Sequence, residues 1–156
     1  MMKVDRYMED SNCLSKAIDI AIEVIKENPP KGWDQETVLR VVNLNLEVKE
    51  NVLNPPAQFR NLKSLKYSSE IVFTKFQEGH GLFVEEFWRK IKSHNLPYKR
   101  ENKMVKIIKR KKINNIQEYD FVIDVIVPYQ QEGLIDKEQV VLLNELIGQF
   151  ESRKKK

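Results

Sequence analysis

The sequence predicts an all-α protein, and three observations lead to this fold class. Apolar residues recur with the helical period of 3.6 along most of the chain. Five Gly and six Pro in 156 residues leave little material for the many turns of an all-β fold. Hydrophobic residues make up 41% of the chain, which is enough to bury a core in a protein of this size. We expect a single domain of five or six helices over residues 1–152, followed by a basic tail at 153–156.

The first half of the chain predicts a helical hairpin. Residues 11–27 place apolar side chains on one face of a helix and charged side chains on the other. A second pattern begins at Asp34, a preferred N-cap residue, and Trp33 can pack against Val38 one turn later. An Asn-Pro-Pro sequence follows each of the two patterns and ends it.

Two further helices are expected between residues 57 and 96. The first has a less regular apolar face, formed by Leu62, Leu65, Ser69, Val72 and Phe76. The sequence "EGHG" at 78–81 separates it from a helix with a dense apolar stripe, which contains Phe83, Val84, Phe87, Trp88 and Ile91. Pro97 is expected to end this helix.

Residues 98–133 allow two interpretations. In one, residues 100–111 form a helix, and Asn115 with Glu118 caps another helix that runs through Tyr119, Ile123 and Ile126 to Gly133. In the other, the fold is α+β, and Asn114-Asn115 forms the turn of a β-hairpin at about 103–127. The apolar residues of this region come in adjacent pairs, which is helical spacing, so we prefer the helices.

The last helix has the clearest start signal in the chain. Asp136 is the expected N-cap, Gln139 completes a capping box, and Ile135 can pack against Val140. One face of this helix carries Leu142, Leu143, Leu146, Ile147 and Phe150. The preceding Gly133 fits the residue that follows a helix end, so the chain is predicted to close with an αα-hairpin.

Several classes of function lack the residues that they require. Cys13 is the single cysteine, and it forms no metal-binding cluster with His80 or His94, so we expect neither a structural zinc nor a cofactor. No P-loop or dinucleotide fingerprint is present. The chain shows no signal peptide and no apolar run long enough to cross a membrane. We therefore expect a cytoplasmic, non-enzymatic binding protein.

The charge of the chain is strongly uneven. Residues 98–113 hold eight Lys or Arg and one Glu, although the net charge of the whole chain is only +4. If this segment is helical, Lys99, Lys103, Lys106 and Arg110 lie within an arc of about 60° and form one positive ridge. Such a ridge suits the phosphate backbone of a nucleic acid, without reading its bases. The basic tail can add to the same surface.

Other interpretations remain beside nucleic-acid association. The ridge can instead pair with an acidic protein or with the acidic remainder of the chain. An apolar helix face in residues 82–91 or 140–150 can serve a protein-interaction module or a homo-oligomer. Asp120 and Asp124 share a helix face and could hold Mg²⁺ in a hydrolase, but such acids are also the ordinary polar side of an amphipathic helix, and we prefer that interpretation.

Overall fold

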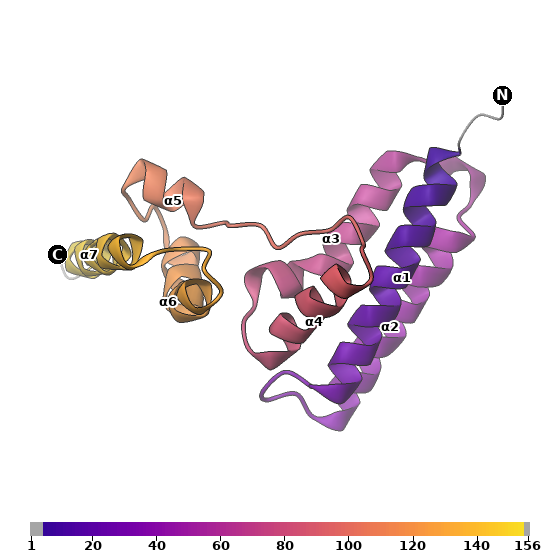
Figure 1. The fold of residues 1–156 in the computed structure, drawn as a ribbon, viewed down its shortest axis with the longest axis horizontal. Helices are drawn as coiled ribbons and strands as arrows, with labels where there is room; N and C mark the ends of the chain where they lie inside the picture. Colours follow the sequence, from indigo (N-terminus) through magenta and orange to yellow (C-terminus); the bar gives the residue numbers. More distant parts are fainter. Residues whose placement is uncertain (1–4, 155–156) are drawn as a thin grey trace. The chain divides into compact units, whose positions relative to one another are not determined.

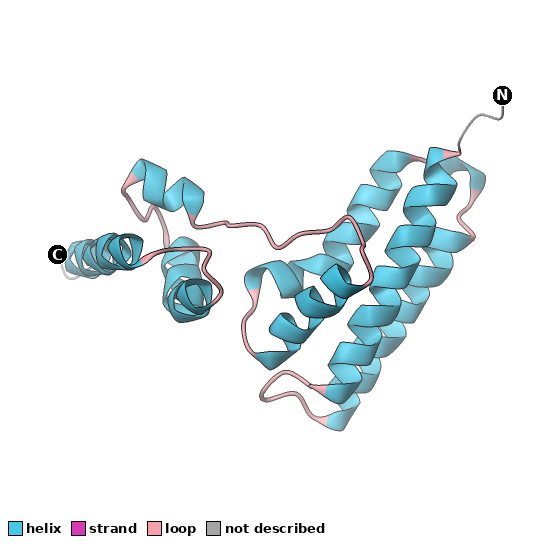
Figure 2. Cartoon of the chain, viewed as in Figure 1, coloured by secondary structure: helices cyan, strands magenta, loops and turns pink. Residues whose placement is uncertain are grey.

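The computed structural model describes residues 5–154, without the side chain of Lys154, and it is helical apart from its connections (Figures 1 and 2). The helices are α1 (Arg6–Glu27), α2 (Gln35–Leu53), α3 (Leu62–Glu78), α4 (Leu82–Ser93), α5 (Val105–Arg110), α6 (Ile116–Gln131) and α7 (Lys137–Lys154), with a short 3₁₀ turn at Ala57–Phe59. The all-α prediction is confirmed for these residues, which contain no strand. The helix count of five or six is too low, because each of the less regular segments forms a separate helix.

The alternative hairpin at about 103–127 is wrong. The side chain of Asn115 accepts a hydrogen bond from the backbone N–H of Glu118 at 2.9 Å, which caps α6. The Glu118 carboxylate in turn accepts from the N–H of Asn114 at 2.8 Å. The two asparagines that could have formed a hairpin turn therefore begin a helix.

The described chain divides into two compact units, each with its own hydrophobic core. The N-terminal unit contains the residues up to Gln77 and those from Gly81 to Lys99, and the C-terminal unit contains Glu78–His80 and the residues from Arg100 onward. The sequence predicts one domain over residues 1–152, whereas the structure distributes the apolar residues between two cores.

The N-terminal unit is built on a hairpin of α1 and α2, as the sequence predicts. Asp34 is the N-cap of α2, and its side chain accepts from the N–H of Thr37 at 2.8 Å. Helix α1 begins at Arg6, earlier than expected, because Asp5 caps it and accepts from the N–H of Met8. The hydroxyl of the buried Tyr7 donates to the carbonyl of Val52 at 2.8 Å and joins the start of α1 to the end of α2.

Aromatic contacts join α3 to α4. The rings of Phe76 and Phe87 stack with their centroids 3.8 Å apart, and both side chains are fully buried. The indole N–H of Trp88 donates to the carbonyl of Phe76 at 2.9 Å. Lys90 attaches α4 to α1 through ion pairs with Glu23 and Glu27. The aromatic stripe of α4 therefore belongs to the core, with Phe87 buried and with Phe83 and Trp88 partly buried against it.

Helix α4 ends before the position that the sequence predicts. It stops at Ser93, four residues before Pro97. Asn95 has a φ of 55°, and the N–H groups of Asn95 and Leu96 donate to the carbonyls of Lys92 and Ile91. The left-handed asparagine reverses the chain before the proline is reached.

The C-terminal unit contains α5, α6 and α7. The α6–α7 connection is confirmed as the turn of an αα-hairpin: Gly133 has a φ of 77°, its N–H donates to the carbonyl of Gln130, and Leu134 donates to Tyr129. The capping box of α7 is also present, since the N–H of Gln139 donates to Asp136 and the Gln139 side chain accepts from the N–H of Asp136. Leu143 and Leu146 are buried, as expected.

The buried face of α6 differs from the predicted one. The buried residues are Val122, Val125 and Tyr129, whereas Ile123 is 45% exposed. The helix carries apolar residues on nearly every side, so their spacing does not determine which side meets α7. One apolar face is consequently left exposed.

Replacing Phe87 by Ala should lower the free energy of unfolding by about 3–5 kcal/mol, because the change leaves a cavity beside the Phe76 ring. Urea denaturation followed by tryptophan fluorescence measures this, since Trp33 and Trp88 both belong to the N-terminal unit. Leu39→Ala is the matched control, because Leu39 is 61% exposed and its loss should change stability by less than about 0.5 kcal/mol. Equal losses in the two variants would contradict this account of the core.

Candidate functional site

The predicted basic helix over residues 100–111 is shorter in the structure, where α5 covers only Val105–Arg110. The preceding segment is held in an irregular conformation by contacts with α6 and the turn after it. The Asn102 side chain donates to the carbonyl of Leu134 at 2.6 Å, and Arg100 lies over the ring of Tyr129. Lys111, with a φ of 58°, ends the helix.

The four residues of the predicted ridge are therefore not brought together on one helix face. Lys99 belongs to the N-terminal unit, and Lys103 precedes α5. Of the four, only Lys106 and Arg110 lie on α5 itself. The row that the sequence suggests depends on helical backbone from residue 99 onward, and that backbone is absent.

Two of the predicted cations already have carboxylate partners. Lys103 forms an ion pair with Glu78 at 3.0 Å. Arg110 forms one with Glu118 at 2.5 Å, and its hydrogen bond to this carboxylate holds the pKa of Glu118 below its usual value. Arg110 also donates to the carbonyl of Lys112, so it fastens the loop that follows α5 to the start of α6.

A smaller cationic surface remains, and we call it the cationic turn. It consists of exposed lysines that form no ion pair with any residue in the range 5–153: Lys106, Lys109, Lys111 and Lys112. The backbone of the turn is held at a second point by Arg153 of α7, which donates to the carbonyl of Ile113 at 2.6 Å. The first residue of the predicted tail is thus part of α7, and residues 155–156 lie outside the described chain.

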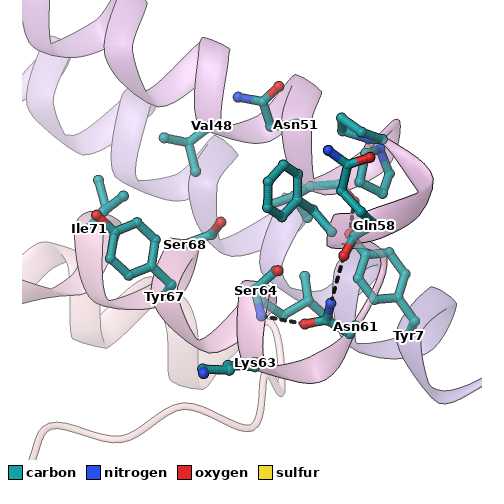
Figure 3. Close-up of a pocket in the computed structure, with 15 residues that line it drawn as sticks. Tyr7, Val48, Asn51, Gln58, Asn61, Lys63, Ser64, Tyr67, Ser68 and Ile71 are labelled. Atoms are coloured by element: carbon teal, nitrogen blue, oxygen red, sulfur yellow. Dashed lines mark hydrogen bonds between the residues drawn. The ribbon is translucent and has the colours of Figure 1, made fainter.

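The N-terminal unit contains a larger concave site, the α2–α3 groove (Figure 3). Its volume is about 710 Å³, within the range of roughly 300–1,000 Å³ that is common for ligand clefts. Helix α2 and the following loop supply Val48, Asn51, Val52, Pro55 and Pro56, and Tyr7 comes from α1. The 3₁₀ turn and α3 supply the other side, with Gln58, Phe59, Asn61, Lys63, Ser64, Leu65, Tyr67, Ser68 and Ile71.

Large apolar side chains of the groove are open to solvent. Tyr67 is 68% exposed, Phe59 is 53% exposed and Ile71 is 39% exposed, while Val48, Val52 and Leu65 are buried beneath them. Asn61 caps the start of α3 by accepting from the N–H of Ser64 at 2.9 Å and also donates to the carbonyl of Gln58, so its side chain fixes this end of the groove (Figure 3). Among residues 5–154, Lys63 is the single charged residue of the lining.

The groove does not coincide with the apolar faces that the sequence suggests for protein contact. In 82–91 the residues Val84, Phe87 and Ile91 are buried core, and in 140–150 the same holds for Leu143 and Leu146. The sequence does carry a signal for the groove, because Tyr67 and Ile71 are apolar residues that the expected core face of α3 leaves out. Apolar residues that lie outside the core face of a helix indicate an apolar surface exposed to solvent.

The acidic pair and the histidines form no metal site in the described part of the chain. Asp120 and Asp124 are both exposed on α6, and no group of three His, Cys, Asp or Glu side chains in that part could hold a metal ion. His80 lies in the turn between α3 and α4, and His94 follows the end of α4. None of the described helices has both the length and the apolar character needed to cross a bilayer.

Comparisons of the chain with protein families, with curated proteins and with solved structures give no match. The functional argument therefore depends on the two surfaces of this structure, the α2–α3 groove and the cationic turn.

Lys75 is a half-buried lysine on α3 that forms no ion pair with any residue in the range 5–153. Its ammonium group donates to the carbonyl of Val72 at 3.1 Å and lies 5.4 Å from the centre of the Phe76 ring. Burial lowers the pKa of Lys75 from 10.5 to about 8, because the charged form loses its hydration. The unfolded chain therefore binds more protons than the folded chain between pH 8 and 10.5, and stability contributed by this group rises with pH in that window.

Comparison of the wild type with Lys75→Met at several pH values tests this. The wild type should gain stability relative to the variant between pH 7.5 and 10, by on the order of 2–3 kcal/mol, as the buried amine loses its proton. Urea denaturation followed by tryptophan fluorescence gives the free energies of unfolding. Lys66→Met, at an exposed position on the same helix, is the control, and an equal pH dependence in both variants would contradict the assignment to Lys75.

Proposed function

We propose that this protein is a non-catalytic protein-interaction module whose α2–α3 groove receives the apolar face of a helix from another polypeptide. The observation that carries the proposal is the exposure of Tyr67, Phe59 and Ile71 around a cavity with a buried apolar floor. Monomeric proteins seldom leave such side chains together in solvent unless they serve a contact.

The geometry of the groove favours a helix as its occupant. Its two long sides are themselves helices, with Val48 and Val52 spaced four apart on α2 and Tyr67 and Ile71 spaced four apart on α3. A helix that lies between two others inserts residues of the same spacing into such a groove. The described residues of the lining include Lys63 and no carboxylate, and their other polar groups are amides and hydroxyls, so an occupant with apolar and acidic residues is favoured over a basic one.

Binding is a better interpretation of this site than catalysis. The titratable residues that the described chain places in the groove are Lys63, Tyr7 and Tyr67, and these supply no pair of acid and base. We infer accordingly that the protein works without a cofactor. The single cysteine of the chain supports a cytoplasmic setting, where thiols are kept reduced.

Selection of a displayed library of helical peptides against the wild type tests this function. Peptides with apolar residues at i, i+4 and i+7 should be enriched, and they should lose at least about tenfold in affinity for Tyr67→Glu, because the change places a carboxylate on the groove wall. Fluorescence anisotropy with the selected peptides measures the loss.

Leu39→Glu is the matched control for this experiment. It introduces the same charge at an exposed apolar residue of α2 that does not line the groove, so the peptides should bind it as they bind the wild type. Peptides that bind wild type and Tyr67→Glu equally would remove the groove as the binding site.

A second candidate function, association with the backbone of a nucleic acid, is supported by the cationic turn. Its four lysines lie within seven consecutive residues, and none of them is neutralised by a carboxylate of residues 5–153. Flexible lysine side chains supply affinity for phosphates that weakens with salt and carries no base preference. Lys103 and Arg110 strengthen this surface less than the sequence suggests, because each is already paired.

Changing all four lysines of the cationic turn to Gln should abolish most of the affinity for single-stranded RNA or DNA at about 50 mM salt. The slope of log affinity against log salt should fall by up to about four, one unit for each lost phosphate contact. A labelled oligonucleotide titration at several salt concentrations measures both quantities. The control neutralises four exposed lysines of the N-terminal unit, Lys16, Lys26, Lys31 and Lys66, and the proposal fails if this variant loses as much.

A further inference from the structure

Helix α6 presents an apolar ridge that the described residues of the C-terminal unit leave partly exposed. Ile116, Ile123 and Val127 are respectively 36%, 45% and 58% exposed. They are spaced at i, i+7 and i+11, which places them within an arc of about 40° on the side opposite the buried Val125. We call these three residues the α6 ridge.

The α6 ridge and the α2–α3 groove agree in length. The ridge spans twelve residues of helix, from Ile116 to Val127, a rise of about 16 Å along its axis. The groove is lined along α3 from Asn61 to Ile71, a rise of about 15 Å. A helix of the size of α6 can therefore place all three ridge residues along the α3 side of the groove.

The charges beside the two surfaces are opposite in sign. Asp120 and Asp124 border one side of the α6 ridge, and both are exposed. Lys63 is the only charged residue that the described part of the chain contributes to the groove lining. Complementary charges at the edge of an apolar contact set the direction and register of the docked helix more than its affinity.

We propose that the partner of the groove is a second copy of this chain, which inserts its α6 ridge into the α2–α3 groove. This inference rests on the proposed function of the groove and adds the identity of its occupant. The contact joins two different surfaces, so each copy keeps one groove or one ridge available for the next copy. The assembly therefore closes as a dimer with two reciprocal contacts or as a larger ring, or it grows as an open chain.

Sedimentation velocity of the full chain tests this arrangement. The wild type should associate into dimers or larger species as its concentration rises, and Leu39→Glu should do the same. Tyr67→Glu, which blocks the groove, and Val127→Glu, which blocks the ridge, should each be monomeric at the same concentration. Both positions are exposed, so the helical content measured by circular dichroism should match the wild type.

Mixing the two monomeric variants gives the decisive result. Tyr67→Glu retains its α6 ridge and Val127→Glu retains its groove, so an equimolar mixture should form a one-to-one dimer and nothing larger. Lys63→Glu should weaken wild-type association several-fold, and additional change of Asp120 and Asp124 to Lys should restore it.

The possible failures are distinguishable. A wild type that stays monomeric at all concentrations but binds selected peptides through Tyr67 overturns the second copy as partner and leaves the groove as a binding site. A wild type that associates while the mixed variants remain monomeric overturns the ridge-in-groove contact. Loss of both association and peptide binding removes the groove from either role.

Discussion

Burial of α1 is the interaction on which the N-terminal unit depends. Its apolar face, with Ala17, Ile18, Ala21, Val24 and Ile25 fully buried, packs against both α2 and α4. The small alanines allow a neighbouring helix to approach, and the branched side chains fill the space around them. Lys90 of α4 and Lys49 of α2 add ion pairs to α1 at the edges of this contact, where solvent limits their contribution to stability.

The α2–α3 groove follows from this arrangement. Helices α2 and α3 meet the rest of the unit through their buried residues, such as Val52 and Val72, and this leaves Tyr67 and Ile71 exposed at its surface. The 3₁₀ turn with Pro55 and Pro56 separates the two helices and lends apolar surface of its own. A core that is complete without these residues leaves them available for a contact with another molecule.

Local signals predicted the helices well and the cationic site poorly, for a physical reason. The capping residues Asp34, Asn115 and Asp136 act through hydrogen bonds to backbone only three residues away, so their effect is visible in the sequence. The segment before α5 is shaped by Tyr129 and by the carbonyl of Leu134, which lie some thirty residues later. Helical spacing alone could not report contacts of that range, and the ridge that it implied for Lys99 was lost. The groove depends in the same way on which apolar residues the tertiary packing leaves over.

The backbone of the loop after α5 and the lysine side chains on it respond differently to ionic strength. Arg110 and Arg153 hold the backbone through the carbonyls of Lys112 and Ile113, and hydrogen bonds of this short range are little affected by dissolved ions. The four lysines carried by that backbone are exposed, and their attraction for distant charge weakens as salt is added. A change in the salt content of the surroundings should therefore alter what the lysines attract while the loop that displays them keeps its shape.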